Sequence, residues 1–272
     1  MKSLDETRKS TAESGTATNI ANYNKLIGKF IIFGPAYNPQ NDLLKIPNMQ
    51  EQSAKVQHSI NDVDYWLAVS KIAEEKRKQV FQILLPTVTR VPAVAIALGM
   101  LESSVKHIKE IVKKMRGVRV KPILPTPPIE EIDPKKYISV SQTSFSEQIE
   151  HMNKLISYLE QQPKYTPAET DLKISGLNKL RDEMGATNDA AIEANNYLQE
   201  MRGIRDELMY ASKTGMVDTA LAAKEYVKAI FGAASWQYKE VRHIKFKNKK
   251  IQKNIVISSQ TYSETKESRD KN

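Results

Sequence analysis

The sequence predicts an all-α protein made of two tandem, internally duplicated three-helix units, each running up, down and up. Long kinked central helices would make it an elongated helical bundle. Three observations support this prediction. Glycine is scarce, with 10 residues in 272, which favours helices over turn-rich strands. Apolar residues recur at helical spacing along most of the chain. Finally, one stretch of the sequence occurs twice.

The repeated stretch begins with Asn-Lys-Leu-Ile, which occurs at 24–27 and again at 153–156. Further along, the spacing between the two copies is shorter by one, and Arg77 then falls on Arg205. Five more residues match at that spacing: Tyr37, Pro39, Leu44, Lys45 and Ile46 against Tyr165, Pro167, Leu172, Lys173 and Ile174. A nearly constant spacing over some fifty residues indicates an internal duplication.

The first helix of each copy is predicted from an apolar face with helical spacing. In copy one this face consists of Ile20, Tyr23, Ile27, Phe30 and Ile31. In copy two it consists of Phe145, Ile149, Met152, Ile156 and Leu159. Both helices are expected to end in a proline-containing turn.

That turn carries signals for the start of the second helix. The pairs Asn-Pro at 38–39 and Thr-Pro at 166–167 predict an N-cap followed by proline at the first helical position. Glu169 would complete a capping box with the threonine. Tyr37 and Tyr165 are expected to pack over the helix end rather than to face a ligand.

The second helix is expected to be long, from Pro39 to Leu85 in copy one. Breakers at Pro47 and at Ser175-Gly176 predict a kink in both copies. Beyond the kink, apolar residues alternate at spacings of four and three, with small residues near the middle, which predicts a heptad seam. The seam residues are Val56, Ile60, Val63, Leu67 and Ser70 in copy one, and Leu177, Leu180, Met184, Thr187, Ala191, Ala194, Leu198 and Met201 in copy two.

The third helix differs between the copies. In copy two it is expected to run from near Val217 to Gly232, with Ser235 capping one more short helix. In copy one a single helix is predicted to follow Pro92 and to present Val94, Leu98, Leu101, Val105, Ile108, Val112 and Met115 on one face.

These elements predict a domain organisation of five segments. Residues 1–17 are a disordered tail, and 18–117 form the first repeat. A linker at 118–137, extended and semi-rigid because it is rich in proline, leads to the second repeat at 138–246. Residues 247–272 are a basic and then polar tail. The sequence leaves open whether the two copies lie parallel or antiparallel.

Composition excludes several classes of protein. The chain has no cysteine, so it has neither disulfides nor thiolate metal sites. Its start lacks the apolar segment of a signal peptide, so we expect a cytoplasmic protein, although export without a leader would escape this argument. The most apolar run, 80–101, contains Arg90, Pro86 and Pro92. We therefore expect a buried helical junction there rather than a membrane span.

Motifs for catalysis are missing from the sequence. It has no glycine-rich phosphate loop and no nucleophile elbow. Glu147 and His151 share a helix face, but a di-iron bundle needs further Glu and a second Glu-x-x-His motif, so we expect a solvated ion pair. Carboxylate pairs such as Glu74-Glu75 lie among basic residues and are expected to be solubilising. We therefore predict a non-enzymatic protein without a metal, a cofactor or a small-molecule substrate.

Charge is the feature that indicates a partner. The chain carries a formal net charge of +9, and two clusters account for its basic excess. The first comprises Lys106, Lys109, Lys113, Lys114, Arg116, Arg119 and Lys121. The second comprises Arg242, Lys245, Lys247, Lys249, Lys250 and Lys253. They are candidates for binding a polyanion, although basic residues at the C-terminal ends of helices also complement the helix dipole and aid solubility.

The closing block at 215–246, with its Tyr-Val-Lys-Ala-Ile-Phe-Gly stretch, resembles that of a family of uncharacterised bacterial tandem-duplicated helical proteins. The Ala-Tyr-Asn-Pro turn and the Tyr-Thr-Pro-Ala-Glu-Thr-Asp-Leu-Lys-Ile helix start resemble that family as well. The chain departs from its pattern at 233–236, where the family has a Ser-Pro pair. The resemblance implies a duplicated helical fold and no known activity.

Three function hypotheses follow from the sequence. The first is a structural or protein-interaction module, with self-assembly as one form of that interaction, because long heptad seams suit helix docking. The alternative is nucleic-acid or polyanion binding through the two basic clusters. The third is a membrane-active protein that inserts the hairpin at 80–101. The charge of Arg90 and the two prolines in that stretch argue against insertion. We therefore expect a protein partner or self-assembly, allow for nucleic acid, and do not expect a membrane partner.

Overall fold

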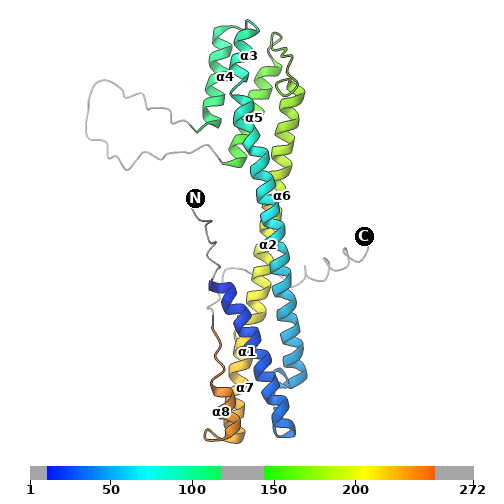
Figure 1. Cartoon of the computed structure of the whole chain (residues 1–272), viewed down its shortest axis with the longest axis vertical. Coiled ribbons are helices and arrows are strands. Elements are labelled where there is room, and N and C mark those ends of the chain that lie inside the picture. The colour runs from blue at the N-terminus through cyan, green and yellow to red at the C-terminus, as the bar shows by residue number, and fades with distance from the viewer. Residues whose placement is uncertain (1–10, 118–143, 249–272) are drawn as a thin grey trace, which may run out of the picture. The chain divides into compact units, whose positions relative to one another are not determined.

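A computed structural model describes residues 11–117 and 144–248 of the chain, and every regular element in these ranges is a helix. The all-α prediction is therefore confirmed. The α-helices are α1 (Thr11–Phe33), α2 (Ile46–Val88), α3 (Val91–Ala97), α4 (Glu102–Met115), α5 (Phe145–Glu160), α6 (Ile174–Tyr210), α7 (Met216–Phe231) and α8 (Trp236–Arg242), as labelled in Figure 1. Short 3-10 turns, Gly34–Ala36 and Asp42–Leu44, lie between α1 and α2. The predicted linker at 118–137 lies outside the described residues.

The chain divides into two compact units that do not coincide with the predicted repeats. Unit 1 contains the residues up to Trp66 and those from Tyr197 onward, and unit 2 contains Leu67 to Asn196. The boundaries fall within α2 and α6, so each of these long helices contributes to both units. Each unit thus takes helices from both predicted repeats, 18–117 and 138–246.

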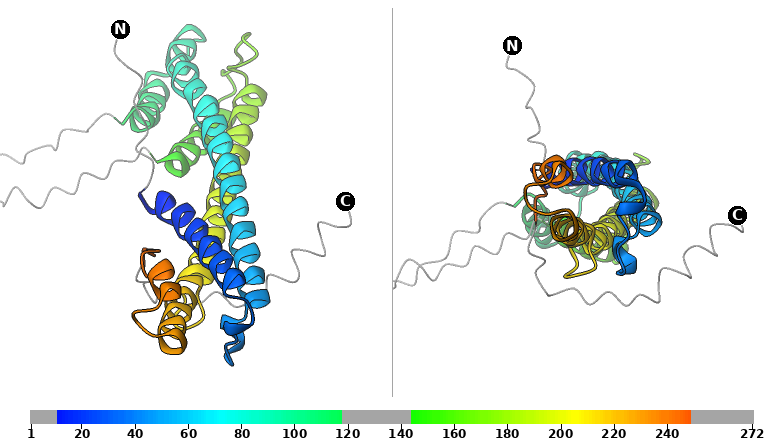
Figure 2. Two further views of the ribbon diagram at one scale, coloured as in Figure 1. Left: turned by 60° about the horizontal axis from the view of Figure 1, so that its bottom comes forward. Right: turned by 90° about the horizontal axis from the view of Figure 1, so that it is seen from below.

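Unit 1 is built around α1, which packs against α7 and α8 (Figure 2). Its core is rich in aromatic rings near the end of α1. Phe30 stacks on Tyr37 with ring centroids 4.1 Å apart, and Tyr226 meets Tyr37 edge-on at 5.5 Å. Burial of such large rings provides much of the apolar stabilisation that holds a helix pair together.

Unit 2 is built around α4 and α5, with α3 packed on α4. Its core takes residues from the second half of α2, from α3, α4 and α5, and from the first half of α6. Fully buried side chains include Leu84, Ile108, Met115, Met152 and Leu155. The apolar face predicted for 145–159 is confirmed at Met152, Ile156 and Leu159.

The long helices run antiparallel within each unit. In unit 1, Trp66 of α2 stacks on Tyr197 of α6, while Gln52 donates to the carbonyl of Thr214 at 2.8 Å. In unit 2, Arg77 donates to Asn188, and Arg90, just after α2, pairs with Asp171, just before α6. In both units, moving toward the C-terminal end of α2 brings contacts with residues closer to the N-terminal end of α6, as expected for antiparallel helices.

Most residues of the predicted seams are buried within the chain. Val56, Val63 and Ser70 of α2 are buried, and so are all but one of the predicted seam residues of α6: Leu177, Leu180, Met184, Thr187, Ala191, Ala194 and Leu198. Ile60, Leu67 and Met201 are only partly buried. Because these faces are already packed within one chain, they are not free to pair with another copy.

The predicted helix starts at 38–39 and 166–167 are wrong. α2 begins at Ile46 and α6 at Ile174, after turns that occupy the intervening residues. Pro47 and Ser175-Gly176 therefore lie in the first turn of each helix, where a missing N–H or a glycine causes no kink. The box predicted for Thr166 and Glu169 caps no helix, whereas a capping box does form at Ser144 and Glu147.

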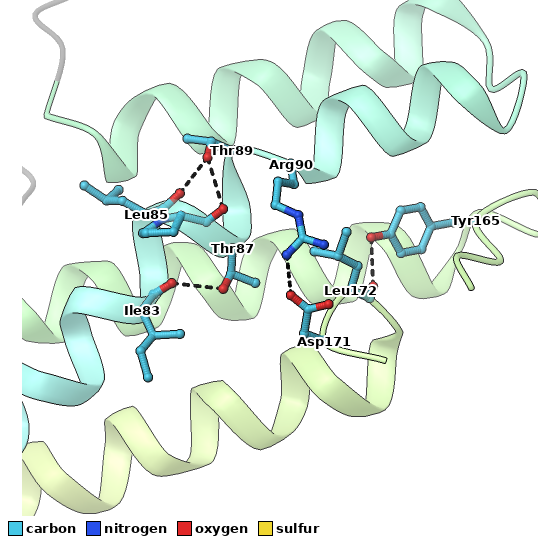
Figure 3. A network of polar contacts seen from close by, with 9 residues as sticks. Ile83, Leu85, Thr87, Thr89, Arg90, Tyr165, Asp171 and Leu172 are labelled. Atoms are coloured by element: carbon cyan, nitrogen blue, oxygen red, sulfur yellow. Dashed lines mark hydrogen bonds and ion pairs between the residues drawn. The ribbon is translucent and has the colours of Figure 1, made fainter. Parts of the chain in front are cut away.

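Pro86 lies inside α2, which continues to Val88 instead of ending at Leu85. Threonine hydroxyls donate to carbonyls of the same stretch (Figure 3). Thr87 donates to Ile83 O at 2.9 Å, and Thr89 donates to Leu85 O at 2.8 Å. Such side-chain bonds help to satisfy the carbonyls around an internal proline.

The single third helix predicted for copy one is interrupted. α3 ends at Ala97 and α4 begins at Glu102, with Gly99 at φ +67° between them. A left-handed residue of this kind ends a helix, and glycine adopts it without steric cost. Leu101 is therefore exposed rather than part of a continuous seam, whereas Val105, Ile108, Val112 and Met115 are buried.

In copy two the predictions for the third helix hold. α7 ends at Phe231 before Gly232, and the Ser235 hydroxyl accepts from Tyr238 N at the start of α8.

Three boundary details also differ from expectation. α1 begins at Thr11, within the predicted tail, and Thr16 is buried. Lys247, assigned to the C-terminal tail, is hydrogen bonded to Asn19 through its backbone. Ile31 is exposed, because the buried face of α1 continues through Phe33 instead.

Candidate interaction surfaces

The first basic cluster lies on α4 and its C-terminal end. Lys106, Lys109, Lys113 and Arg116 follow one another at spacings of three, four and three, so they form one stripe on the helix. The opposite face of α4 is buried. All four side chains are exposed, and within the described ranges none of them makes an ion pair. We call this set the α4 basic stripe.

Other cations of the first cluster are placed differently. Lys114 lies off the stripe, and its charge is one of those that lower the pKa of His151. Arg119 and Lys121 lie outside the described residues.

The second basic cluster is described only in part. Arg242, Lys245 and Lys247 are exposed, whereas Lys249, Lys250 and Lys253 lie outside the described residues. The buried amide of Asn19 donates to Lys247 O at 2.8 Å and accepts from Lys247 N at 2.9 Å. This pairing fixes the backbone of the segment after α8 along α1.

Further bonds hold the same segment from two sides. Asn22 donates to Lys245 O at 2.8 Å. Lys224 of α7 donates to Arg242 O at 3.2 Å and to Ile244 O at 2.9 Å, and its burial lowers its pKa. The segment is thus bound through its backbone, which leaves the cationic side chains of Lys245 and Lys247 toward solvent.

The ion pair predicted between Glu147 and His151 is wrong. Glu147 accepts from the backbone and hydroxyl of Ser144 in the capping box. His151 is buried with no hydrogen-bond partner on either ring nitrogen. Burial, with the charges of Lys154 and Lys114, lowers its pKa, so the neutral imidazole is favoured.

Several acidic side chains form ion pairs with basic residues of the same helix. Glu74 pairs with Lys71, Asp182 with Arg181, and Asp206 with Arg205. No group of three or more His, Cys, Asp or Glu residues suited to a metal ion occurs within 11–117 and 144–248.

An uncharged end of unit 1 was missed by the sequence reasoning. The run 30–41 and the run 229–238 contain no Asp, Glu, Lys or Arg. They meet because Phe33 contacts the rings of Phe231 at 5.7 Å and Trp236 at 5.4 Å. The missing charges could have been noticed in the sequence, but not the contact between two runs so far apart along the chain.

Comparison with protein-family models, with curated proteins and with solved structures finds no match to this chain. The resemblance to an uncharacterised helical family thus stays a prediction.

The stretch Ile46–Ala97 includes one helical window that is long and apolar enough, by length and composition alone, to cross a membrane. A core helix passes the same test, so this observation is weak evidence for a span.

Proposed function

We propose that the chain is a non-enzymatic helical module that acts by binding a partner through its outer surfaces. The observation that carries this proposal is that no group of three or more His, Asp or Glu residues suited to a metal ion occurs in the described residues, and that several acidic groups pair within their own helix. Arg181 with Asp182, Arg205 with Asp206, and Ser144 with Glu147 each serve the helix that contains them. Catalysis by carboxylates or histidine needs groups that converge on one site.

A duplicated helical segment would explain how the module arose. Besides the repeated sequence, a hydrogen bond that occurs in both copies supports a duplication. The hydroxyl of Tyr37 donates to Leu44 O at 2.9 Å, and that of Tyr165 donates to Leu172 O, also at 2.9 Å. Both tyrosines are buried in turns that precede a long helix. The same side chain thus makes the same bond at matching places in the two copies.

Self-assembly is the first form of binding to test. Since the seams are buried within the chain, a second copy would have to dock on exposed surfaces. Light scattering on a sizing column, from about 1 to 100 μM protein, measures the mass directly. We expect a mass that rises above the monomer's 30.8 kDa with concentration. A constant 30.8 kDa would contradict self-assembly and leave a different partner as the form of the proposal.

Polyanion binding is a second candidate, favoured by the α4 basic stripe. Four exposed cations on one helix face, without carboxylate partners in the described residues, form an electrostatic surface for phosphates or sulfates. Binding of this kind weakens steeply with salt, because each neutralised phosphate releases counterions.

Fluorescence anisotropy with labelled duplex DNA and with heparin tests this candidate. The triple variant Lys106→Glu, Lys109→Glu and Lys113→Glu should weaken binding by about a hundredfold or more and flatten its salt dependence. A matched control reverses the same amount of charge at three other exposed lysines of unit 2: Lys76, Lys78 and Lys173. Equal losses in the two triple variants would contradict a dedicated stripe.

A further inference from the structure

The uncharged end of unit 1 exposes large apolar side chains. Ile32, in the last turn of α1, is 69% exposed, and Trp236, at the start of α8, is 57% exposed. Ile31 is 54% exposed, and Pro35, Ala233 and Ala234, which lie close to these residues in the sequence, are exposed as well. We call these six residues the apolar end. The contacts of Phe33 with Phe231 and Trp236 fix the two parts of this surface against each other.

The absence of charge at this end is unusual for the chain. Charged residues make up 27% of the sequence, so the two uncharged runs together would contain about six at that frequency. Soluble proteins keep such exposed patches small unless they serve an interaction. The apolar end is therefore a candidate docking surface.

Cations lie just behind the apolar end. Lys239 and Arg242 are exposed in the last turn of α8, and Lys228 is exposed near the end of α7. Two carboxylates partly offset them, since Glu240 pairs with Lys29 and Glu225 lies 3.4 Å from Lys228. With Lys29 counted, four cations stand against these two carboxylates, so the charge balance beside the apolar end is positive.

A second copy of the chain fits this surface poorly. A stable protein interface involves ~20–30 residues on each side, whereas the apolar end has six. A membrane makes lower demands, because its surface needs only a few apolar side chains, an aromatic ring at the interface and cations for anionic headgroups.

We propose that the apolar end of unit 1 docks on anionic lipid surfaces by shallow insertion. Trp236 and Ile32 enter the boundary between headgroups and acyl chains, ~5–10 Å deep, while Lys239 and Arg242 contact anionic headgroups. The bilayer core, ~30 Å thick, is not crossed. This inference goes beyond the proposed function, since it names a lipid surface rather than a protein, and it does not involve the α4 basic stripe.

Binding to vesicles of defined composition tests the inference. The full chain is mixed with vesicles of phosphatidylcholine alone or with about one third phosphatidylglycerol, then floated on a density gradient. We expect flotation only with the anionic vesicles. The emission of Trp236, isolated by Trp66→Phe since the chain has two tryptophans, should shift to shorter wavelength on binding. No flotation with either vesicle would overturn the proposal.

A matched pair of double variants locates the surface. Ile31→Glu with Ile32→Gln introduces the residues that end the first helix of the second copy, Glu160 and Gln161. The control, Ile72→Glu with Ile96→Gln, makes the same changes in unit 2 at side chains that are 70% and 57% exposed. We expect at least a tenfold loss of vesicle affinity in the first variant and little change in the second.

Other outcomes would assign the binding elsewhere. If the Ile72 and Ile96 variant lost vesicle binding while the Ile31 and Ile32 variant kept it, the proposal would be overturned and the binding surface would lie on α2 and α3. Flotation without a shift in Trp236 emission would show binding by the cations alone and would overturn the insertion. If the wild-type chain were a dimer and the Ile31 and Ile32 variant a monomer, the apolar end would bind a second copy of the chain instead of a membrane. Unchanged circular dichroism excludes misfolding as the cause.

Discussion

The turn before α2 and the turn before α6 share an internal frame. In both, a buried tyrosine donates its hydroxyl to a carbonyl seven residues later, Tyr37 to Leu44 and Tyr165 to Leu172. The proline two residues after each tyrosine is buried as well. The core of the turn is therefore the same in two places, set by one hydrogen bond and a few packed side chains.

The outer faces of the same two turns differ. When the turns are aligned on their tyrosines, three uncharged residues of the first stand where the second has charged ones: Ala36, Asn41 and Leu43 against Lys164, Glu169 and Asp171. In the second turn the charges are used, because Asp171 pairs with Arg90 (Figure 3) and Lys164 donates to Gly99 O. The comparison teaches that the buried frame specifies the turn, while its outer face is free to pair with other helices or to make only local contacts, such as the ion pair of Asp42 with Lys45.

The largest difference between the turns is expected at Gly176. A Cβ there would lie 2.2 Å from Thr170 O, whereas Asn48, at the corresponding position, donates its side chain to Asp42 O at 2.7 Å. Gly176→Asn should lower the free energy of unfolding by about 2–3 kcal/mol, because backbone must move. Asn48→Gly should cost about 1 kcal/mol, the value of one hydrogen bond.

Urea unfolding followed by circular dichroism measures both changes. Equal losses in the two variants would mean that the turn before α6 relaxes around the added atoms, and that the two turns are interchangeable at this position.

The shared hydrogen bond predicts equal losses in the two turns. Tyr37→Phe and Tyr165→Phe each leave a carbonyl without its donor, at a cost of about 1–2 kcal/mol. Tyr65→Phe is the control, since Tyr65 is exposed and should tolerate the change. The same urea titration measures the stability of both variants. A loss of stability in only one of them would show that the hydrogen bond does not have the same role in the two turns.

Alkaline pH should weaken both turns through the same tyrosines. Burial, with the charges of Glu169 and Asp171, raises the pKa of Tyr165 to about 12. Burial also raises the pKa of Tyr37. A raised pKa stabilises the fold fully below the unfolded value of about 10, and this stability is lost as the pH rises from there toward the folded value.

Unfolding in urea at pH 9 and pH 11 measures that loss. The wild-type chain should lose about 1 kcal/mol more than Tyr165→Phe over this interval. The same loss in both chains would show that Tyr165 ionises equally in the folded and unfolded states.

The smallest effect is expected for the ion pair on the outside of the second turn. Arg90 and Asp171 are both about half exposed, so their coupling should be ~0.2–1 kcal/mol. A double-mutant cycle of Arg90→Gln and Asp171→Asn measures it, at about 0.05 and 0.5 M salt, where screening should reduce it. A coupling that is unchanged by salt would show that the pair is shielded from solvent.

The fold class, the helix seams and the C-terminal boundary of α7 could be predicted because each rests on spacing or on a local residue. The seam around Met184 and Ala191 is an example, and so is Gly232 after α7. The starts of α2 and α6 could not be predicted from the sequence. A proline at the beginning of a turn and a proline at the first position of a helix give the same sequence pattern. The choice depends on the buried Tyr37 and Tyr165, which only the tertiary structure reveals.

The candidate surfaces were predicted unevenly for a similar reason. The spacing of Lys106, Lys109 and Lys113 could be read from the sequence, because one helix carries them. The apolar end could not, because Ile32 and Trp236 belong to helices far apart in the chain, and their exposure depends on how α1 and α7 pack. Ile31 was even assigned to the buried face of its helix.

The division of α2 and α6 between the two units also bears on the order in which the protein is made. Unit 2 is a continuous segment, so all its core residues have left the ribosome once residue 196 has emerged. Unit 1 needs residues before 67 together with those after 196, so the part of α1 that packs against α7 and α8 stays uncovered until those helices have been synthesised. A nascent chain therefore leaves Phe33 without its ring partners Phe231 and Trp236 for most of its synthesis, and a chaperone that binds apolar helices would find its longest opportunity there.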